Sequence, residues 1–524
     1  MVARRLSGEF PAPTIPAFYA GKSVFITGAT GFMGKVLIER ILATCPNVGC
    51  LYLLMREKKD QSPEKRLLQL KQSQVFDVLR RTQPAQLDKL RSLSGDTSRE
   101  QLGMDSNSLQ QLREVSIVFH VAATLKFDEE LRKAVEENLR SIMRLLNICD
   151  SLPHIEALVH VSTAYCMAEL AEVEERVYTP IVPLPTLEAL VDHADEAMRQ
   201  QLVQLLLGDK PNTYTFTKAM AEHAVVEHKA QYPVAIFRPT VVISSLRSPV
   251  PGWIEYLNGP SGVVVGAGKG LLHTFRCTKS ARADLLPVDI AIGTMITCAW
   301  DVATNRQATP RVYNCSTYEN PTTWSDFERC IRKEIIEQPL DAPLWYPCAF
   351  IAENKYVHKL YELVLQTGPL HLAEWSARAV GMKPKINLIT VSRKLRAMSD
   401  VLMFFSLREW RFRTENVQRL RDRLSPQDAA IYNLDVNTID WRQHMKNFMM
   451  GVRKYLLKEK DQDIEAAKKH LRKMYWVHTG VKLLLLGLTL RLLLRGPAAQ
   501  SLAGALRLLL SLCTAVYSRL LPAA

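Results

Sequence analysis

The sequence predicts an α/β fold built on a doubly wound parallel sheet, and two observations support this prediction. Short apolar runs of strand length alternate with polar segments that have helical spacing. A glycine-rich turn follows the first run directly, and residues 35–44 then repeat apolar side chains at helical intervals. Such alternation is typical of parallel strands connected by helices that cover both faces of a sheet. The strands are expected at residues 22–27, 50–55, 117–120, 157–161 and 234–237.

The length of 524 residues is too great for one ordinary hydrophobic core and indicates several structural units. From about Pro249 the chain becomes rich in loops, and after residue 340 it shows long helical patterns with many aromatic residues. We therefore expect four parts. They are an N-terminal leader over 1–20, a sheet-bearing domain with loop-rich insertions over 21–340, a helical C-terminal domain over 341–458, and a basic linker with apolar helices over 459–524.

The composition is that of a globular protein, with 47% hydrophobic and 23% charged residues. A formal net charge of +14 favours an anionic partner, such as a nucleic acid, an anionic membrane, or an anionic cofactor and substrate. No zinc-finger spacing or aromatic–basic pattern occurs, so a nucleic-acid partner is not expected. The cysteines include no C-x-x-C pair and the histidines no H-E-x-x-H pattern. Neither a disulfide framework nor a metal site is therefore predicted, and residues 1–20 lack the apolar run of a signal peptide.

Two apolar stretches form the C-terminal tail. Val481–Leu494 is dominated by leucine but contains Lys482 and Arg491, and Ser501–Leu521 is the second stretch. A membrane-spanning helix needs about 20 mostly apolar residues. Three arrangements stay open, namely a helical hairpin through a bilayer, helices lying in its interface, and a soluble helical pair packed on the body. The first two make membrane lipid a partner, and the basic residues beside the first stretch suit anionic headgroups.

Residues 27–34 form the glycine-rich turn T-G-A-T-G-F-M-G between a predicted strand and a predicted helix. Its glycines allow a sharp turn and let backbone N–H groups approach a pyrophosphate, while the helix N-terminus adds partial positive charge. The order of strand, turn and helix predicts a Rossmann-type dinucleotide site. The residues expected to contact the dinucleotide here are Thr27, Gly28, Thr30, Gly31, Phe32, Met33 and Gly34.

The end of the second predicted strand distinguishes NADPH from NADH. An acidic residue there would bind the ribose 2′-hydroxyl of NADH, whereas this chain has Arg56, with Lys58 and Lys59 just beyond. A guanidinium suits a 2′-phosphate because it is always charged and binds with two parallel hydrogen bonds. The cofactor is therefore expected to be NADPH.

Two further segments are expected to approach the cofactor. Asp96 follows Gly95 and either contacts the adenine or serves as a turn aspartate. Ala122 and Ala123 follow a predicted strand, and their small side chains would let the backbone run close to the dinucleotide. His120, at the end of that strand, is interpreted as structural.

Tyr214 and Lys218 form a Y-x-x-x-K pair, which lies on one face of a helix. The ammonium would lower the pKa of the tyrosine and bind the nicotinamide ribose, so that Tyr214 could give a proton to an oxygen that receives hydride. Ser162 and Thr163 follow a predicted strand, and one hydroxyl would bind the reacting carbonyl; Thr163 is favoured. A covalent route through Cys166 is not expected, because no paired base is visible.

These motifs resemble those of the extended short-chain dehydrogenases/reductases, and more narrowly those of the animal fatty acyl-CoA reductases. The resemblance covers nearly the whole chain. It rests on residues 21–37, 119–124, 238–240, 251–253, 286–289, 455–459 and 469–473, together with Ser162–Tyr165 and the Tyr214–Lys218 pair. It also places Pro239 and Thr240 beside the cofactor.

The resemblance implies a reaction at residues 21–340. Long-chain acyl-CoA is reduced by NADPH to an aldehyde that stays bound, and a second NADPH reduces the aldehyde to a primary alcohol for ether lipids or waxes. It further implies a peroxisomal membrane location with the catalytic domain facing the cytosol, the endoplasmic reticulum being the alternative. A related steroid-type reductase and a non-catalytic NADPH-binding scaffold remain alternatives. Lys269 in the glycine-rich segment 266–270 either contacts CoA or lies in a surface loop, which is favoured. Acyl-chain preference and formation of a homo-oligomer stay open.

Overall fold

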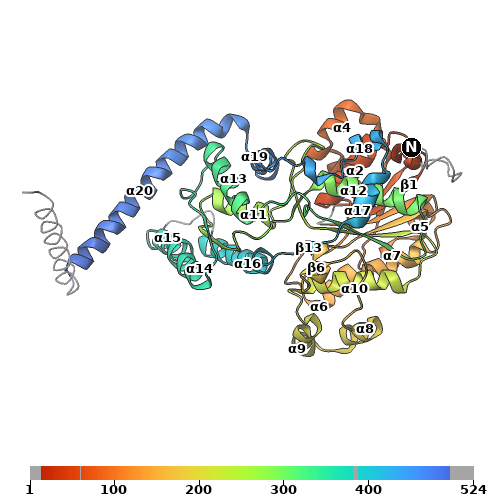
Figure 1. Cartoon of the computed structure of the whole chain (residues 1–524), viewed down its shortest axis with the longest axis horizontal. Coiled ribbons are helices and arrows are strands. Elements are labelled where there is room, and N and C mark those ends of the chain that lie inside the picture. The colour runs from red at the N-terminus through yellow and green to blue at the C-terminus, as the bar shows by residue number, and fades with distance from the viewer. Residues whose placement is uncertain (1–12, 59–60, 382–386, 496–524) are drawn as a thin grey trace, which may run out of the picture.

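A computed structural model describes residues 13–58, 61–381 and 387–495 of the chain, with side chains to residue 491. Lys59 and the second apolar stretch, 501–521, lie outside the described residues. The central feature is a seven-stranded sheet whose strand order is β11-β7-β5-β4-β1-β2-β3, with every neighbouring pair parallel. Figure 1 shows this sheet at the end of the molecule that holds the N-terminal part. The strands are β1 (Ser23–Thr27), β2 (Leu51–Met55), β3 (Leu90–Ser94), β4 (Val115–His120), β5 (Ala157–Val161), β7 (Val234–Pro239) and β11 (Arg311–Cys315).

Five of these strands confirm the sequence prediction, and the doubly wound arrangement explains why they could be recognised. Strands β1, β2, β4, β5 and β7 are buried along their whole length, since helices cover both faces of the sheet. The two edge strands were not predicted. Of the five residues of β3, only Leu90 and Leu93 are buried, so its sequence carries no continuous apolar run.

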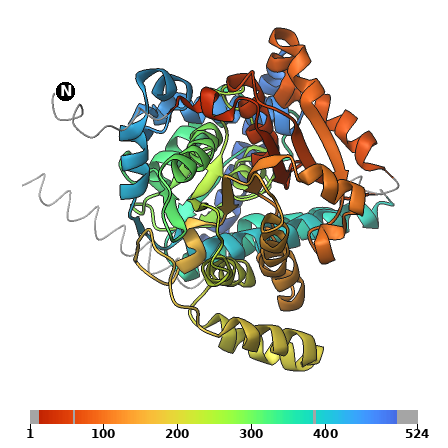
Figure 2. The same cartoon turned by 90° about the vertical axis from the view of Figure 1, so that its right-hand side faces the viewer.

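Helices cover both faces of the sheet (Figures 1 and 2). On one face α2 (Phe32–Thr44) and α12 (Val288–Thr304) share a core with the inner strands, and on the other α7 (Ser141–Cys149) and α10 (Thr213–Glu227) form a second core. Other helices around the sheet are α1 (Ile15–Tyr19), α3 (Pro63–Lys71), α4 (Asp77–Thr82), α5 (Ser106–Leu112), α6 (Leu131–Ala134), α8 (Leu184–His193) and α9 (Glu196–Leu207).

A second group of elements lies beyond the carboxyl ends of the strands. It contains the small parallel pairs β8–β10 and β9–β12, and a set of helices, three of which line one side of a cavity. The strands are β8 (Val241–Ile243), β9 (Thr274–Arg276), β10 (Leu285–Pro287) and β12 (Phe350–Ala352), and β6 (Glu172–Val173) pairs with β13 (Arg411–Phe412). The helices are α11 (Pro260–Gly268), α13 (Trp324–Glu337), α14 (Lys355–Tyr361), α15 (Gly368–Ala379), α16 (Leu388–Ser406) and α19 (Trp441–Gly451).

Segments from both ends of the chain pack onto the sheet domain. In α1, Ile15 and Tyr19 are fully buried, and the Tyr19 hydroxyl donates to the Ile296 carbonyl at 2.9 Å. From the C-terminal side, α17 (Glu415–Arg423) and α18 (Pro426–Ile431) return to the same core, where Tyr432 is buried. Figure 1 shows α17 and α18 beside α2 and α12.

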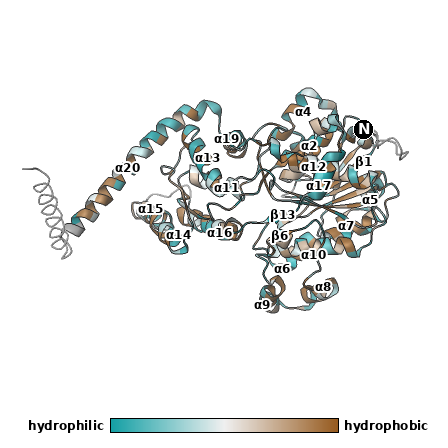
Figure 3. Ribbon diagram, in the orientation of Figure 1, coloured by the Kyte–Doolittle hydropathy of each residue, from teal (hydrophilic) through white to brown (hydrophobic). Residues whose placement is uncertain are grey.

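The last described element, α20 (Ile464–Arg495), is a 32-residue helix that extends away from the body. Its apolar residues gather toward the far end (Figure 3). None of the helices in the described part of the chain combines the length and the apolar composition needed to cross a membrane. The transmembrane helix predicted as one arrangement of Val481–Leu494 is therefore not found there. Lys482, Arg491 and Arg495 place charges at intervals that interrupt the run of leucines.

Candidate active site

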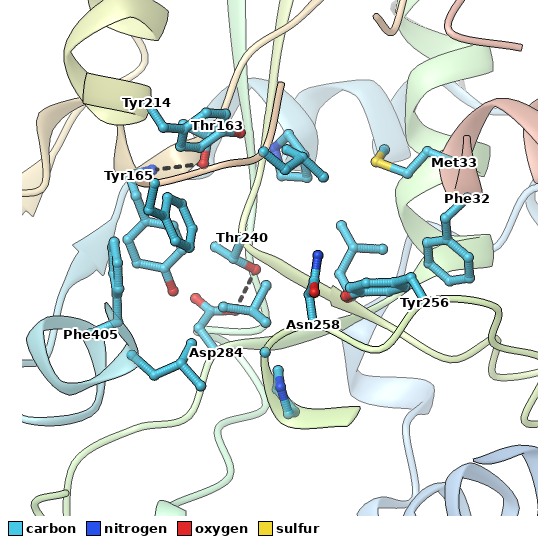
Figure 4. Close-up of a pocket in the computed structure, with 18 of the residues that line it drawn as sticks. Phe32, Met33, Thr163, Tyr165, Tyr214, Thr240, Tyr256, Asn258, Asp284 and Phe405 are labelled. Atoms are coloured by element: carbon cyan, nitrogen blue, oxygen red, sulfur yellow. Dashed lines mark hydrogen bonds between the residues drawn. The ribbon is translucent and has the colours of Figure 1, made fainter. Parts of the chain in front are cut away.

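A cavity of about 690 Å³ lies over the carboxyl ends of the central strands. Parallel α/β sheets bind their ligands at this edge. One side of the cavity is formed by the glycine turn and the ends of β1, β4 and β5, and the other by α11, α13 and α16. Figure 4 shows side chains from both sides converging on the same space, with Met33 and Phe32 at one end and Phe405 at the other.

The glycine turn has the geometry that close approach of a dinucleotide requires. Gly28 has a φ of +74°, and a Cβ there would lie 2.6 Å from the backbone nitrogen of Ala122. A Cβ on Gly34 would lie 2.3 Å from the carbonyl oxygen of Gly28, so α2 can pack against the turn only without a side chain. Gly31 caps α2, whose first turn carries no acidic residue. The helix N-terminus is thus electrostatically suited to an anion.

Thr27 is the one predicted cofactor residue that does not line the cavity. It is fully buried, with its hydroxyl 2.8 Å from His120 Nδ1, and it accepts a hydrogen bond from the Ala122 nitrogen at 3.3 Å. Thr27 therefore holds the turn against the end of β4. Burial lowers the pKa of His120 to about 3, with a further contribution from Lys218, so that this imidazole is neutral and structural, as predicted.

Three basic side chains line the cavity near the end of β2, and one of them, Arg66, was not predicted from the sequence. Arg56 and Lys58 line the cavity, and so does Arg66 from α3. The Arg66 guanidinium donates to the Thr30 hydroxyl at 3.3 Å and to the Arg56 carbonyl at 2.5 Å. It thereby joins the glycine turn to the strand end. Only the tertiary fold could reveal Arg66, because nothing in the spacing of α3 distinguishes it from other surface cations.

Asp96, Ala122 and Ala123 also line the cavity. The carboxylate of Asp96 accepts from the backbone nitrogen and the hydroxyl of Ser98, at 3.0 and 2.8 Å, and its other oxygen lies 4.0 Å from Arg56. Asp96 is thus a turn aspartate that also lines the cavity, and its contact with the adenine stays a prediction.

Four predicted catalytic residues lie around the cavity beneath the glycine turn. Tyr214 and Lys218 come from α10, and the Lys218 ammonium donates to the Val161 carbonyl at 2.8 Å, at the end of β5. Thr163 begins a short turn after β5, and its hydroxyl accepts from the Tyr165 nitrogen at 3.3 Å (Figure 4). The hydroxyl of Ser162 is buried and has no hydrogen-bond partner in the part of the chain that the structure describes.

Burial moves the pKa values of the catalytic pair in opposite directions. It raises the pKa of Tyr214 well above its ordinary value, while the adjoining Thr163 hydroxyl lowers it. It lowers the pKa of Lys218 to about 8, and the Glu222 carboxylate opposes this change. Glu222 lies one turn further along α10 and binds Arg238 through both carboxylate oxygens, at 2.8 and 2.5 Å. This buried ion pair ties α10 to β7.

The Lys218 pKa predicts a pH dependence of the reaction. The ammonium is the form that can bind a ribose and support Tyr214, and it is lost as the pH rises through about 8. We therefore expect kcat/KM for NADPH, which reports the free enzyme, to fall between pH 7 and pH 9. Lys218→Arg, whose guanidinium stays charged over this range, should show no such decline in its remaining activity. A wild-type profile that is flat to pH 10 would contradict the role of Lys218.

Two other residues considered from the sequence have structural positions. Cys166 is fully buried, does not line the cavity, and burial raises the pKa of its thiol to about 12, which makes it a poor nucleophile. Lys269, a candidate contact for CoA, instead donates to the Asp341 carbonyl at 2.5 Å and pairs with Glu459 at 2.9 Å.

The far wall of the site is organised by Asp284, which the sequence reasoning missed. Pro239 and Thr240 line the cavity as predicted, and the Thr240 hydroxyl donates to Asp284 at 2.8 Å (Figure 4). The same carboxylate accepts from Ser316 and from the backbone and hydroxyl of Thr317. Asp284 thus joins the ends of β7 and β11 to the segment before β10.

Comparisons with known proteins agree with this geometry. Residues 26–295 match an NAD-binding family described as male sterility protein, and residues 365–459 match a second family of the same description. Fatty acyl-CoA reductase 1 of Xenopus laevis is 37% identical over 480 residues, covering 91% of this chain and 93% of that protein. Fatty acyl-CoA reductase 2 of Bos taurus is 34% identical, covering 88% and 90%.

Solved structures share the fold. The reductase domain of a non-ribosomal peptide synthetase from Mycobacterium tuberculosis has a TM-score of 0.53 at 16% identity, covering 86% of this chain and 97% of that one. The terminal R domain of the myxalamid pathway has a TM-score of 0.52 at 17% identity, covering 84% and 93%. These likenesses establish the fold of the sheet domain and the helical region after it.

Proposed function

Because the chain belongs to the fatty acyl-CoA reductase family, we propose that it reduces long-chain acyl-CoA to a primary alcohol with two molecules of NADPH. The observation that carries this proposal is one cavity in which the glycine turn, the Tyr214–Lys218 pair and an apolar wall meet. A dinucleotide site alone would serve many reactions. The apolar wall beside the catalytic pair favours a substrate with a long acyl chain.

The residues present fit NADPH. The turn leaves no room for a Cβ on Gly28 or Gly34, and Arg56, Lys58 and Arg66 gather where a 2′-phosphate would lie. Bound there, NADPH supplies one hydride to each of two successive carbonyl groups. Lys218 would hold the nicotinamide ribose with its ammonium, which the Val161 carbonyl already orients.

Tyr214 and Thr163 supply the hydrogen bonds that the reacting carbonyl needs. Charge develops on the thioester oxygen as hydride adds, and two hydroxyl donors in a partly dry site stabilise it. The thiohemiacetal then collapses, the carbon–sulfur bond breaks, and the CoA sulfur leaves as the thiol after protonation. In the second reduction Tyr214 gives its proton to the alkoxide of the aldehyde carbon. The Tyr214 phenol is protonated at neutral pH and so has this proton to give. Burial raises its pKa and makes it a weaker acid, which differs from the lowering by Lys218 that the sequence predicted; the Thr163 hydroxyl is the group that lowers it.

The apolar side of the cavity would hold the acyl chain. It is formed by small and branched residues of α11 and by side chains from α13, β12 and α16. Representative residues are Val264, Ala267, Ile335, Phe350, Leu402 and Phe405. An apolar wall of this kind removes the chain from water without a specific contact, since the hydrophobic effect is not directional.

The proposed reaction is tested by its stoichiometry. The full-length protein is incubated with stearoyl-CoA and NADPH, and the oxidised cofactor, free CoA and lipid products are measured together. Two NADPH oxidised for each CoA released, with octadecanol formed, is the expected result. One NADPH for each CoA, with an aldehyde accumulating, would overturn the second reduction. Binding of NADPH without turnover of any acyl-CoA would overturn the proposal.

Removing either arginine should reduce the preference for NADPH. Arg56→Glu reverses the charge at the phosphate, and Arg66→Ala removes the guanidinium that lies between Thr30 and Arg56. Because a hydrogen bond to a charged group contributes about 1.5–3 kcal/mol, each change should weaken NADPH binding by about 10–100-fold and NADH binding much less. Titration of cofactor fluorescence measures both. Equal losses for the two cofactors would exclude a 2′-phosphate contact.

The cellular role rests on the family resemblance. We propose that the protein acts at the peroxisomal membrane with its catalytic domain in the cytosol and supplies alcohols for ether lipids or waxes. Localisation of the tagged full-length protein against peroxisomal and endoplasmic reticulum markers tests the first part. Loss of ether lipids or waxes from cells that lack the protein tests the second.

A further inference from the structure

The helix that runs from α14 through a π-helical turn (Glu362–Thr367) into α15 has its apolar residues on the outside. Tyr356, Leu360, Val364, Leu372 and Trp375 recur at spacings of three, four and eight, which places them on one side of a helix. They are strongly exposed, from 54% for Val364 to 79% for Tyr356. Together with Leu363, at 59%, they make up the apolar face.

The buried side of the same helix is polar. Its buried residues are His358, Gln366 and Glu374, spaced eight apart. His358 lies 3.2 Å from the Thr274 hydroxyl, and Gln366 accepts from the His273 nitrogen at 3.2 Å. Glu374 accepts from the Leu388 nitrogen at 2.9 Å. These contacts fix the orientation of the helix, so the apolar face cannot turn inward without breaking them. A surface helix of a soluble domain normally has the opposite polarity.

Exposed cations lie on α14 and on α16, the helix that packs against α15. Lys355 and Lys359 lie on α14 and Arg393 and Lys394 on α16, and none of the four forms an ion pair within the described residues. Among the described residues of α14 to α16, Asp400 is the one exposed carboxylate. An apolar surface with uncompensated cations on the same group of helices complements an anionic lipid surface, in which apolar chains and anionic headgroups lie together.

The apolar face and the far half of α20 lie at the same end of the molecule, opposite the sheet domain (Figures 1 and 3). The α20 residues Trp476, Leu483 and Leu484 are 63–70% exposed. Exposed apolar patches larger than a few hundred Å² usually mark an interaction site. From the inverted helix, its cations and its neighbour α20, we propose that the apolar face docks on an anionic lipid bilayer.

This docking would place the substrate cavity over the bilayer. Strand β12 leads directly into α14, and Phe350 of β12 and Leu402 and Phe405 of α16 line the apolar end of the cavity. An acyl chain could therefore pass from the bilayer to the site with little exposure to water. This last step rests on the proposed function, whereas the docking itself does not.

The test uses the fluorescence of Trp375 in the full-length protein. The protein is mixed with vesicles of phosphatidylcholine and phosphatidylserine whose acyl chains are brominated and quench tryptophan on contact. Subtracting the spectrum of Trp375→Phe isolates the emission of Trp375. We expect strong quenching by these vesicles and little by vesicles of phosphatidylcholine alone. Leu360→Glu combined with Leu363→Glu should weaken the quenching about tenfold, since two apolar anchors are lost.

The matched control carries two glutamates on another exposed helix. Met198→Glu with Leu205→Glu changes α9 residues that are 50% and 75% exposed, and it should leave the quenching unchanged. Trp375 emission that brominated lipids do not quench would overturn the proposal. Trp375 that is shielded from acrylamide without lipid would also overturn it, by showing that residues 496–524 or a second copy of the chain covers the face. No acyl-CoA or NADPH is present, so a failed reductase assay leaves this result unaffected.

Discussion

Tyr214→Phe is expected to reduce turnover of acyl-CoA by about 10²–10⁴-fold, the range that a positioned general acid supplies, while leaving NADPH binding nearly unchanged. The substitution removes only the hydroxyl. The ring, which packs edge-on against Phe127 at 5.4 Å, is retained. Stopped assays of alcohol and aldehyde, together with a cofactor titration, separate loss of chemistry from loss of binding.

Tyr165 provides the matched control for this change. It also lines the cavity, and its ring packs against Phe405, Trp410 and Phe412. Its hydroxyl has no hydrogen bond within the described residues, so Tyr165→Phe should keep most of the activity. If Tyr165→Phe lost activity and Tyr214→Phe retained it, the proton donor would have been assigned to the wrong tyrosine.

The parts of the site that the sequence predicted are those held by contacts close along the chain. The glycine turn, the end of β2 and the Tyr214–Lys218 pair each belong to one strand–turn or one helix, so residue spacing predicts their geometry. The predicted groups that follow the strands meet in one cavity because parallel strands end at the same edge of the sheet. With this rule, motifs that are separate along the sequence could be predicted to form one site.

The residues that escaped the prediction are held by contacts distant along the chain. Arg66 reaches Thr30 across 36 positions, and Asp284 binds Thr240 and Thr317 from 44 and 33 positions away. Neither belongs to a local motif. Thr27 was predicted as a cofactor contact because it lies within the glycine motif. In the structure its side chain contacts His120 instead of lining the cavity.

The segments after residue 340 were predicted less well than the sheet because helical periodicity does not say what a helix packs against. The stretch 415–439 returns to the sheet domain. By contrast, α14 and α15 carry the apolar face, and α16 contributes Leu402 and Phe405 to the cavity wall. In α14 and α15 the usual rule, that the apolar side of a helix is buried, predicts the wrong orientation. Here the polar residues face the protein and the apolar residues face outward. A reversed pattern of this kind becomes visible only when exposure is known.

Helix α10 joins the Tyr214–Lys218 pair to the central sheet. Tyr214, Lys218 and Glu222 lie on successive turns of this helix, where they face the substrate space, the end of β5 and Arg238 of β7 in that order. The buried Glu222–Arg238 pair therefore positions Tyr214 by fixing the helix on which it lies. Removing one partner would leave a buried charge uncompensated, which is far more destabilising than losing a surface pair.

Gly28→Ala is expected to abolish NADPH binding, with a loss of more than about 100-fold in affinity and a lower unfolding temperature, because two costs act together. A φ of +74° costs a residue with a Cβ about 1–2 kcal/mol. The new Cβ would also lie 2.6 Å from the Ala122 nitrogen and 2.7 Å from the Val121 carbonyl carbon, both backbone atoms that cannot rotate away. Moving them would displace the segment Val121–Ala123, which lines the cavity beside the glycine turn.

Gly21→Ala separates these two costs. Gly21 has the same φ of +74°, but a Cβ there would meet nothing within 4 Å. This variant should therefore lose about 1–2 kcal/mol of stability and bind NADPH normally. Thermal unfolding and cofactor titration of both variants give the comparison. Equal losses of stability in Gly21→Ala and Gly28→Ala, with NADPH still bound by both, would contradict this reasoning. The requirement for glycine at position 28 would then come from its φ alone and not from the close approach of Ala122.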